Sequence, residues 1–262
     1  MAEAQRYSIP VAEKIDHEHR THGHVREDPY YWLRDDERKS PAVLRYLEYE
    51  NTYAERVLEP TRAVQDRLFE EIKGRIKKDD SSVPYELDGY WYYTRYEEGR
   101  EYAVHCRRKG SMDSPEQLVF DENVEAEPHD FYSLGTARVS SDSDVLAYAE
   151  DTLSRRIYTL RFRNIDTGEV YPESIEGTAG PVAWAMDNKT IFYVKRDPKT
   201  LRAYQVWRHS LGTEPSSDEL VYEETDDTFH VNVYRTRSRE YIVIHSDSTL
   251  VTESRFVSAT EP

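Results

Sequence analysis

Side chains of the types that bind metals crowd together at one place in this sequence. Four histidines, His17, His19, His22 and His24, fall within eight residues. A zinc site needs three or four such side chains converging at about 2.0–2.2 Å, with further groups that orient them. Arg20 lies among the histidines, and the segment has neither helical nor strand periodicity. The pattern therefore favours a solvated loop over a structural metal site, and no cofactor is expected.

The single cysteine, Cys106, cannot form an internal disulfide. It lies in the strand-like run Val104–Arg107, where a cysteine usually serves packing. We therefore expect a packing residue rather than a nucleophile, in a protein that does not depend on an oxidising compartment.

The net charge of the chain limits the classes of partner that it is expected to bind. With 51 acidic and 35 basic residues the net charge is −16, which argues against nucleic acid, because phosphate binding needs clustered Lys and Arg. The surplus indicates a well-solvated surface, and it would also suit an enzyme that draws in peptides rich in Lys and Arg. Residues 1–14 hold no apolar stretch and no run of eighteen apolar residues occurs, so we expect no membrane association and a cytoplasmic protein.

A repeat of four short strands organises most of the chain. Second strands of the repeat begin near Gly89, Val145, Thr190 and Glu240, which gives a period of 45 to 56 residues. Such a period is typical of the blades of a β-propeller. A β-sandwich is the alternative, but it would have turns every eight to twelve residues. It would not have the recurring endings Asp166-Thr167-Gly168 and Leu211-Gly212-Thr213. No stretch of helical period is seen after Lys78.

The first part of the chain has a different composition. Residues 1–35 indicate an extended arm, and a helix is predicted to begin at Pro41, after Ser40 as its N-cap. A second helix is predicted over Thr61–Lys73, followed by Gly74 at its C-cap. We therefore divide the chain into 1–78, the arm and helices, and 79–262, an incomplete propeller. The apolar stripe of the second helix finds no partner in a blade and should be exposed; it consists of Val64, Leu68, Phe69 and Ile72.

Several motifs together resemble the prolyl oligopeptidase family of serine peptidases, and its oligopeptidase B branch, which cleaves after basic residues. They are Asp28–Asp35, Tyr46–Tyr53, Arg75–Pro84, Asp88–Arg95, Val182–Asp187, Gln205–Thr213 and Ser238–Ile242. The acidic tract Glu122–Glu127 matches the family's linker between blades only loosely. The resemblance implies an α/β-hydrolase domain with a Ser, Asp, His triad, covered by a seven-bladed propeller that excludes folded proteins. It also implies that residues 1–78 pack on the hydrolase domain.

The sequence itself holds no nucleophile of that kind. A hydrolase serine sits in a Gly-x-Ser-x-Gly elbow, and none of the ten glycines frames a serine in this way. The histidines of the predicted blades are expected to be strand or loop residues; they are His105, His129, His209, His230 and His245. We therefore assign no catalytic, cofactor-binding or metal-binding residue in this chain. Val83–Pro262 accounts for about three and a half blades, whereas seven need about 350 residues.

These observations predict a mainly β fold, a partial seven-bladed-type propeller after two helices, without the hydrolase domain. The function that they favour is the N-terminal region of a serine endopeptidase, inactive by itself, whose partners are short peptides with basic residues and the missing hydrolase domain. The alternative is a stand-alone half-propeller that binds cationic peptides or proteins. Because unclosed sheets expose unpaired edges, we also expect low solubility or oligomerisation of the isolated chain.

Overall fold

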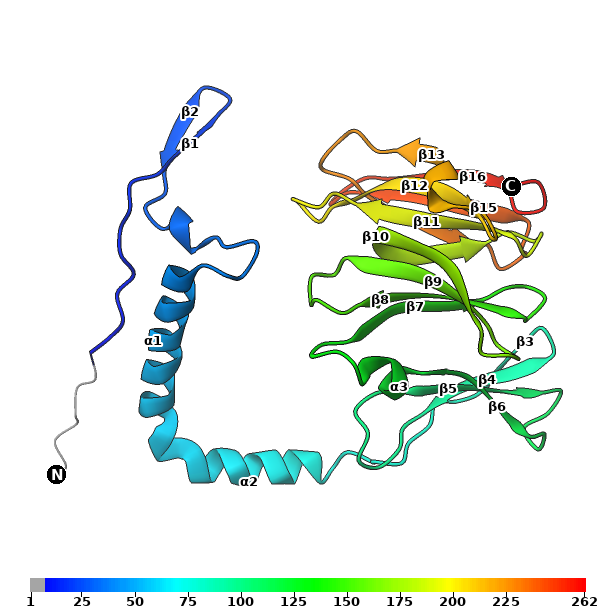
Figure 1. Ribbon diagram of the computed structural model, residues 1–262, viewed down its shortest axis with the longest axis horizontal. Coiled ribbons are helices and arrows are strands. Elements are labelled where there is room, and N and C mark those ends of the chain that lie inside the picture. Colours follow the sequence, from blue (N-terminus) through cyan, green and yellow to red (C-terminus); the bar gives the residue numbers. More distant parts are fainter. Residues whose placement is uncertain (1–7) are drawn as a thin grey trace. The chain divides into compact units, whose positions relative to one another are not determined.

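The computed structural model describes residues 8–262, and the chain divides between Lys77 and Lys78 into two compact units. The elements of the first unit are the strands β1 (Glu18–Thr21) and β2 (His24–Glu27), the helices α1 (Pro41–Leu58) and α2 (Arg62–Lys73), and 3₁₀ turns at Tyr31–Leu33 and Glu59–Thr61 (Figure 1). Helix α1 begins at Pro41 as predicted, although the Ser40 side chain makes no capping hydrogen bond. No helix within residues 8–262 is both long and apolar enough to cross a membrane.

The helices of the first unit bury almost none of their apolar residues. Val43 is the one buried residue of α1, and α2 has none. The predicted stripe Val64, Leu68, Phe69 and Ile72 is 47 to 61 % exposed. The expectation that this stripe is exposed is thus confirmed, and no described residue of the first unit covers it.

The histidine-rich segment is a β-hairpin, so the prediction of a loop in an extended arm was wrong there. Thr21 pairs with His24, and the two residues between them, His22 and Gly23, have φ angles of 53° and 79°. Positive φ at both central positions is the geometry of a type I′ turn, whose twist matches that of the two strands. Backbone pairing of the two strands thus forms the hairpin, although their side chains show no strand periodicity.

The second unit consists of consecutive antiparallel sheets that lie stacked in Figure 1. The first sheet contains β3 (Tyr85–Leu87), β4 (Tyr90–Arg95), β5 (Val104–Lys109) and β6 (Glu116–Asp121). A second, of seven strands, contains β7 (Ser133–Val139), β8 (Val145–Asp151), β9 (Tyr158–Asn164), β10 (Val170–Trp184), β11 (Thr190–Arg196), β12 (Ala203–Ser210) and β13 (Glu219–Glu223). The third contains β14 (His230–Arg235), β15 (Tyr241–Asp247) and β16 (Thr252–Ser258). Short turns of helix, α3 (Glu122–Ala126) and Pro215–Ser217, lie between strands.

The seven-stranded sheet is two blades that share one long strand. The first half of β10 pairs with β9, its second half pairs with β11, and the register shifts between Thr178 and Val182. Gly180, with φ 105°, lies at that shift beside the ring of Tyr158, where a positive φ favours glycine. We therefore describe four blades: blade 1 (β3–β6), blade 2 (β7 to the first half of β10), blade 3 (the second half of β10 to β13) and blade 4 (β14–β16).

The predicted propeller repeat is confirmed. The second strands of the four blades begin at Tyr90, Val145, Thr190 and Tyr241, within one residue of the expected positions. One element was not predicted, the short helix α3 after Lys78. Asp121 caps it, accepting a hydrogen bond from the Asn123 backbone N–H at 2.9 Å.

The middle strands of the blades are buried on both faces. In β8, Val145, Ala147 and Ala149 pack in a cluster with blade 3, whereas Leu146 and Tyr148 pack in a cluster with blade 1. Because successive side chains of a strand point to opposite faces, this alternation places blade 2 between two neighbours. The hydrophobic core of the second unit is therefore a series of layers between sheets.

A buried arginine also joins blades 1 and 2. The Arg107 side chain has no exposed surface. Its guanidinium donates to Gln117 Oε1 at 2.7 Å in its own blade and to the Ser143 carbonyl at 2.5 Å in blade 2. It also lies 4.1 Å from the centre of the Tyr90 ring, a cation–π contact.

We expect Arg107→Met to lower the stability of the second unit by about 2–4 kcal/mol, because the buried Ser143 carbonyl and the half-buried Gln117 amide oxygen lose their donor. The matched control is Arg100→Met, which removes an exposed arginine paired with Asp121 and should cost about 1 kcal/mol or less. Thermal unfolding followed by circular dichroism compares the two. Equal midpoints for both variants would mean that Arg107 does not hold the blades together.

We also expect the isolated chain to self-associate through the outer face of blade 4, where Phe256 is 68 % exposed beside Tyr241. Phe256→Lys should shift the chain toward monomer in light scattering. Leu250→Lys is the control, because Leu250 is equally apolar but lies in the turn between β15 and β16. A monomeric parent chain contradicts the prediction.

Candidate functional site

The first strands of the four blades line the central cavity of the second unit. This cavity, about 660 Å³, is lined by Leu87 of β3, 135–139 of β7 apart from Ala137, 181–184 of β10 and 232–235 of β14, with Thr236, Arg237 and Arg239 from the turn that follows β14. First strands of blades line the channel of a propeller. We call this surface the inner wall.

Hydrogen bonds between neighbouring blades hold the inner wall in place. The Trp184 indole N–H of β10 donates to the Arg138 carbonyl of β7 at 2.9 Å. At the turns that follow these first strands, Asn188 Oδ1 accepts from the Asp142 N–H at 3.1 Å. Arg239 after β14 forms an ion pair with Asp88 after β3, which joins blade 4 to blade 1. The turns of the four blades thus converge at one end of the channel.

A smaller pocket of about 300 Å³ adjoins the inner wall between blades 1 and 2. It is lined by tyrosines and aliphatic residues, and by Cys106, and it shares Leu87, Arg138, Val139 and Arg235 with the central cavity. Burial raises the pKa of the Cys106 thiol to about 11, so the thiol stays protonated at neutral pH. Cys106 is therefore a packing residue, as expected.

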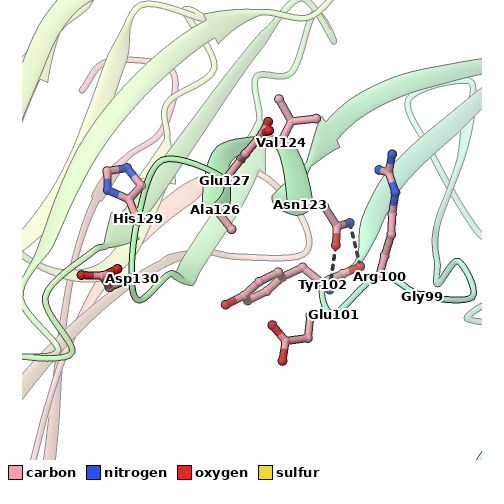
Figure 2. Close-up of a pocket in the computed structure, with 10 residues that line it drawn as sticks. All are labelled: Gly99, Arg100, Glu101, Tyr102, Asn123, Val124, Ala126, Glu127, His129 and Asp130. Carbon is pink, nitrogen blue, oxygen red and sulfur yellow. Dashed lines mark hydrogen bonds between the residues drawn. The ribbon is translucent and has the colours of Figure 1, made fainter.

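Another cavity, of about 740 Å³, lies beside α3 (Figure 2). Asn123 shapes it by bonding both the N–H and the carbonyl of Tyr102, each at 2.9 Å. Figure 2 shows His129 and Asp130 on the opposite side of this pocket from Arg100 and Asn123. Its polar groups do not converge on one point, so the pocket offers no arrangement for catalysis.

The histidines of the first unit make aromatic contacts. The His17 ring stacks on Tyr31 at 4.0 Å between centroids, and His19 meets Tyr31 edge-on at 4.7 Å. Within residues 8–262, no group of three or more His, Cys, Asp or Glu side chains is arranged to hold a metal ion.

Among the histidines of the blades, one forms a buried pair that the sequence did not reveal. His209 Nδ1 lies 2.7 Å from Asp218 Oδ1, both side chains are inaccessible, and the His209 ring stacks on Phe162. Tyr193 donates to the same carboxylate at 2.8 Å. Among the described residues, no serine, cysteine or threonine side chain forms a hydrogen bond with this pair, so it lacks the third member of a nucleophilic triad. The partners lie nine residues apart on either side of a turn, a spacing without a recognisable motif.

Comparisons with known proteins agree on one family. A model of the prolyl oligopeptidase N-terminal β-propeller domain matches residues 10–262. Dipeptidyl aminopeptidase BI of Pseudoxanthomonas mexicana is 42 % identical over 92 % of this chain and 35 % of its own length. Protease 2 of Moraxella lacunata is 32 % identical over 97 % of this chain and 37 % of its own length.

Solved structures give the same result. Oligopeptidase B from Leishmania major matches 97 % of this chain with a TM-score of 0.89 and 29 % identity. The antipain-bound closed form of oligopeptidase B from Trypanosoma brucei matches the same share with a TM-score of 0.88. In both cases this chain spans 38 % of the solved chain. With its repeated blades and its inner wall, the chain belongs to the prolyl oligopeptidase family, in the oligopeptidase B branch, and corresponds to the N-terminal part of these proteins.

Proposed function

We propose that this chain is the N-terminal arm and propeller of a serine endopeptidase that cleaves short peptides after Arg or Lys. The observation that carries the proposal is the agreement with oligopeptidase B from Leishmania major over 97 % of the chain, at a TM-score of 0.89. The preference for basic residues is what membership of this branch implies. The catalytic serine, histidine and aspartate would come from a hydrolase domain outside these residues.

In this proposal residues 1–78 pack on the hydrolase domain. Support comes from α1 and α2, which together bury one apolar side chain and expose the rest of their apolar faces. An amphipathic helix gains most of its stability from covering such a face. A hydrolase domain would supply the missing cover.

The propeller would then limit substrates by size. Hydrogen bonds join blades 2 and 3 along the inner wall, which supports a channel of fixed width between these two blades. A short extended peptide is much narrower than a folded domain and could reach an active site beneath the channel.

A second candidate is the removal of dipeptides from a free N-terminus. The 42 % identity to a dipeptidyl aminopeptidase, over 92 % of the chain, favours it. The two activities differ in what they require of the substrate, because an aminopeptidase needs a free amino group and an endopeptidase does not. The stand-alone half-propeller that binds cationic peptides is less favoured, because four arginines line the inner wall.

The proposal is tested with the chain extended by its natural downstream sequence, beside the 262-residue chain alone. Two coumarin substrates are compared: an N-terminally blocked peptide ending in Arg, and a dipeptide ending in Arg with a free amino group. We expect the extended protein to cleave the blocked substrate, with kcat/KM at least about a hundredfold above the matching Glu substrate. The chain alone should be inactive.

Cleavage of the free dipeptide substrate alone would identify the extended protein as a dipeptidyl aminopeptidase. Equal rates on the Arg and Glu substrates would contradict the basic specificity. Activity of the 262-residue chain would place the catalytic groups within it and overturn the assignment.

A further inference from the structure

The inner wall has a charge opposite to that of the whole chain. The net charge is −16, yet the residues that line the central cavity include Arg138, Arg235, Arg237 and Arg239. None of the described residues that line this cavity is acidic. The acidic surplus therefore lies elsewhere, and the channel offers a cationic surface to whatever enters it.

Three of the four arginines form no ion pair with a carboxylate among residues 8–262: Arg138, Arg235 and Arg237. Arg239 pairs with Asp88, and the charge of Asp88 also acts on Arg235. Arg138 and Arg237 are exposed to the cavity. One Arg138 nitrogen donates to the Ala137 carbonyl at 3.0 Å, which leaves most of the guanidinium donors of that residue available.

Arg235 is the anchored member of the group. Its Nη1 donates to Ser141 Oγ at 2.5 Å and to the Trp184 carbonyl at 3.3 Å. Burial and the positive charge of Arg239 lower the pKa of its guanidinium, and Asp88 opposes them. Like charges held together in a partly desolvated cavity repel one another, and a bound anion relieves that repulsion.

The smaller apolar pocket indicates what kind of anion fits. Arg138 and Arg235 border both cavities, and the smaller one also presents Tyr85, Tyr92 and Val119. A ligand placed across them would have a negative group beside an apolar group. At the C-terminus of a peptide the carboxylate and the last side chain are attached to the same carbon atom. Guanidinium groups bind carboxylates through paired, charge-assisted hydrogen bonds.

We propose that the inner wall binds the C-terminal carboxylate of a short peptide whose last residue is apolar, with that side chain in the pocket between blades 1 and 2. The proposal goes beyond size selection and does not depend on which bond the enzyme cleaves. A cationic wall repels Lys and Arg side chains, so a basic residue of the same peptide would be recognised elsewhere.

The test measures binding to the 262-residue chain by fluorescence anisotropy, without any hydrolysis. The probe is dansyl-Gly-Gly-Leu with a free carboxylate, compared with the same peptide as its C-terminal amide. We expect the acid to bind about tenfold more tightly at low salt, because only the acid offers charged acceptors. The difference should shrink between about 20 mM and about 300 mM salt, as screening increases.

Variants locate the site. Arg138→Gln and Arg237→Gln should each reduce the preference for the acid, whereas Arg208→Gln removes the same charge outside the cavity, from a residue paired with Glu219, and should leave the preference intact. Circular dichroism spectra matching that of the parent chain establish that the variants are folded.

Three results would overturn the proposal. The acid and the amide could bind equally, or not at all. All three variants could weaken binding to the same extent, which would indicate the net charge alone. Inorganic phosphate could displace the probe at the concentration at which acetyl-Gly-Gly-Leu does, which would make the wall a general anion site without a role for the apolar pocket.

Discussion

Each blade of this protein depends on its neighbours because the middle strand of an inner blade is apolar on both faces. The alternation is clearest in β11, where Ile191 and Tyr193 pack toward blade 2 while Phe192 and Val194 pack toward blade 4. If either face of such a sheet lay in water, the folded protein would lose about 25 cal/mol of stabilisation for each Å² of apolar surface left unburied. Stacking of the sheets is therefore a condition for the folding of any one of them, and the exposed Phe256 of blade 4 marks a face where this condition is not met within the chain.

The sequence predicted those parts of the structure that depend on local patterns. Strand periodicity located the second strand of every blade within one residue, and Pro41 located the start of α1. The hairpin at residues 18–27 was missed because its stability comes from backbone pairing across His22 and Gly23 rather than from apolar alternation. The short helix α3 was missed because five residues are too few for a helical period to appear.

Contacts between residues on distant strands could not be predicted from the sequence. Arg107 has the sequence pattern of any charged strand residue, and its burial is explained only by the next blade, where the Ser143 carbonyl accepts a hydrogen bond from its guanidinium. The arginines of the inner wall lie up to 101 positions apart, from Arg138 to Arg239. The net charge of −16 gave no indication of them, because composition averages over surfaces that the fold keeps separate. Local charge, not total charge, decides what the channel attracts.

The strand shared by blades 2 and 3 makes the junction between these two blades different from the other junctions of the chain. A continuous β10 gives these two blades no connecting loop, so pulling them apart would require breaking the hydrogen bonds of β10 with β9 or β11. The other two junctions are crossed by irregular chain, residues 122–132 around α3 and residues 224–229. Within residues 8–262, blades 2 and 3 are therefore the pair whose separation would break strand pairing, whereas the two junctions of irregular chain could adjust without such a loss.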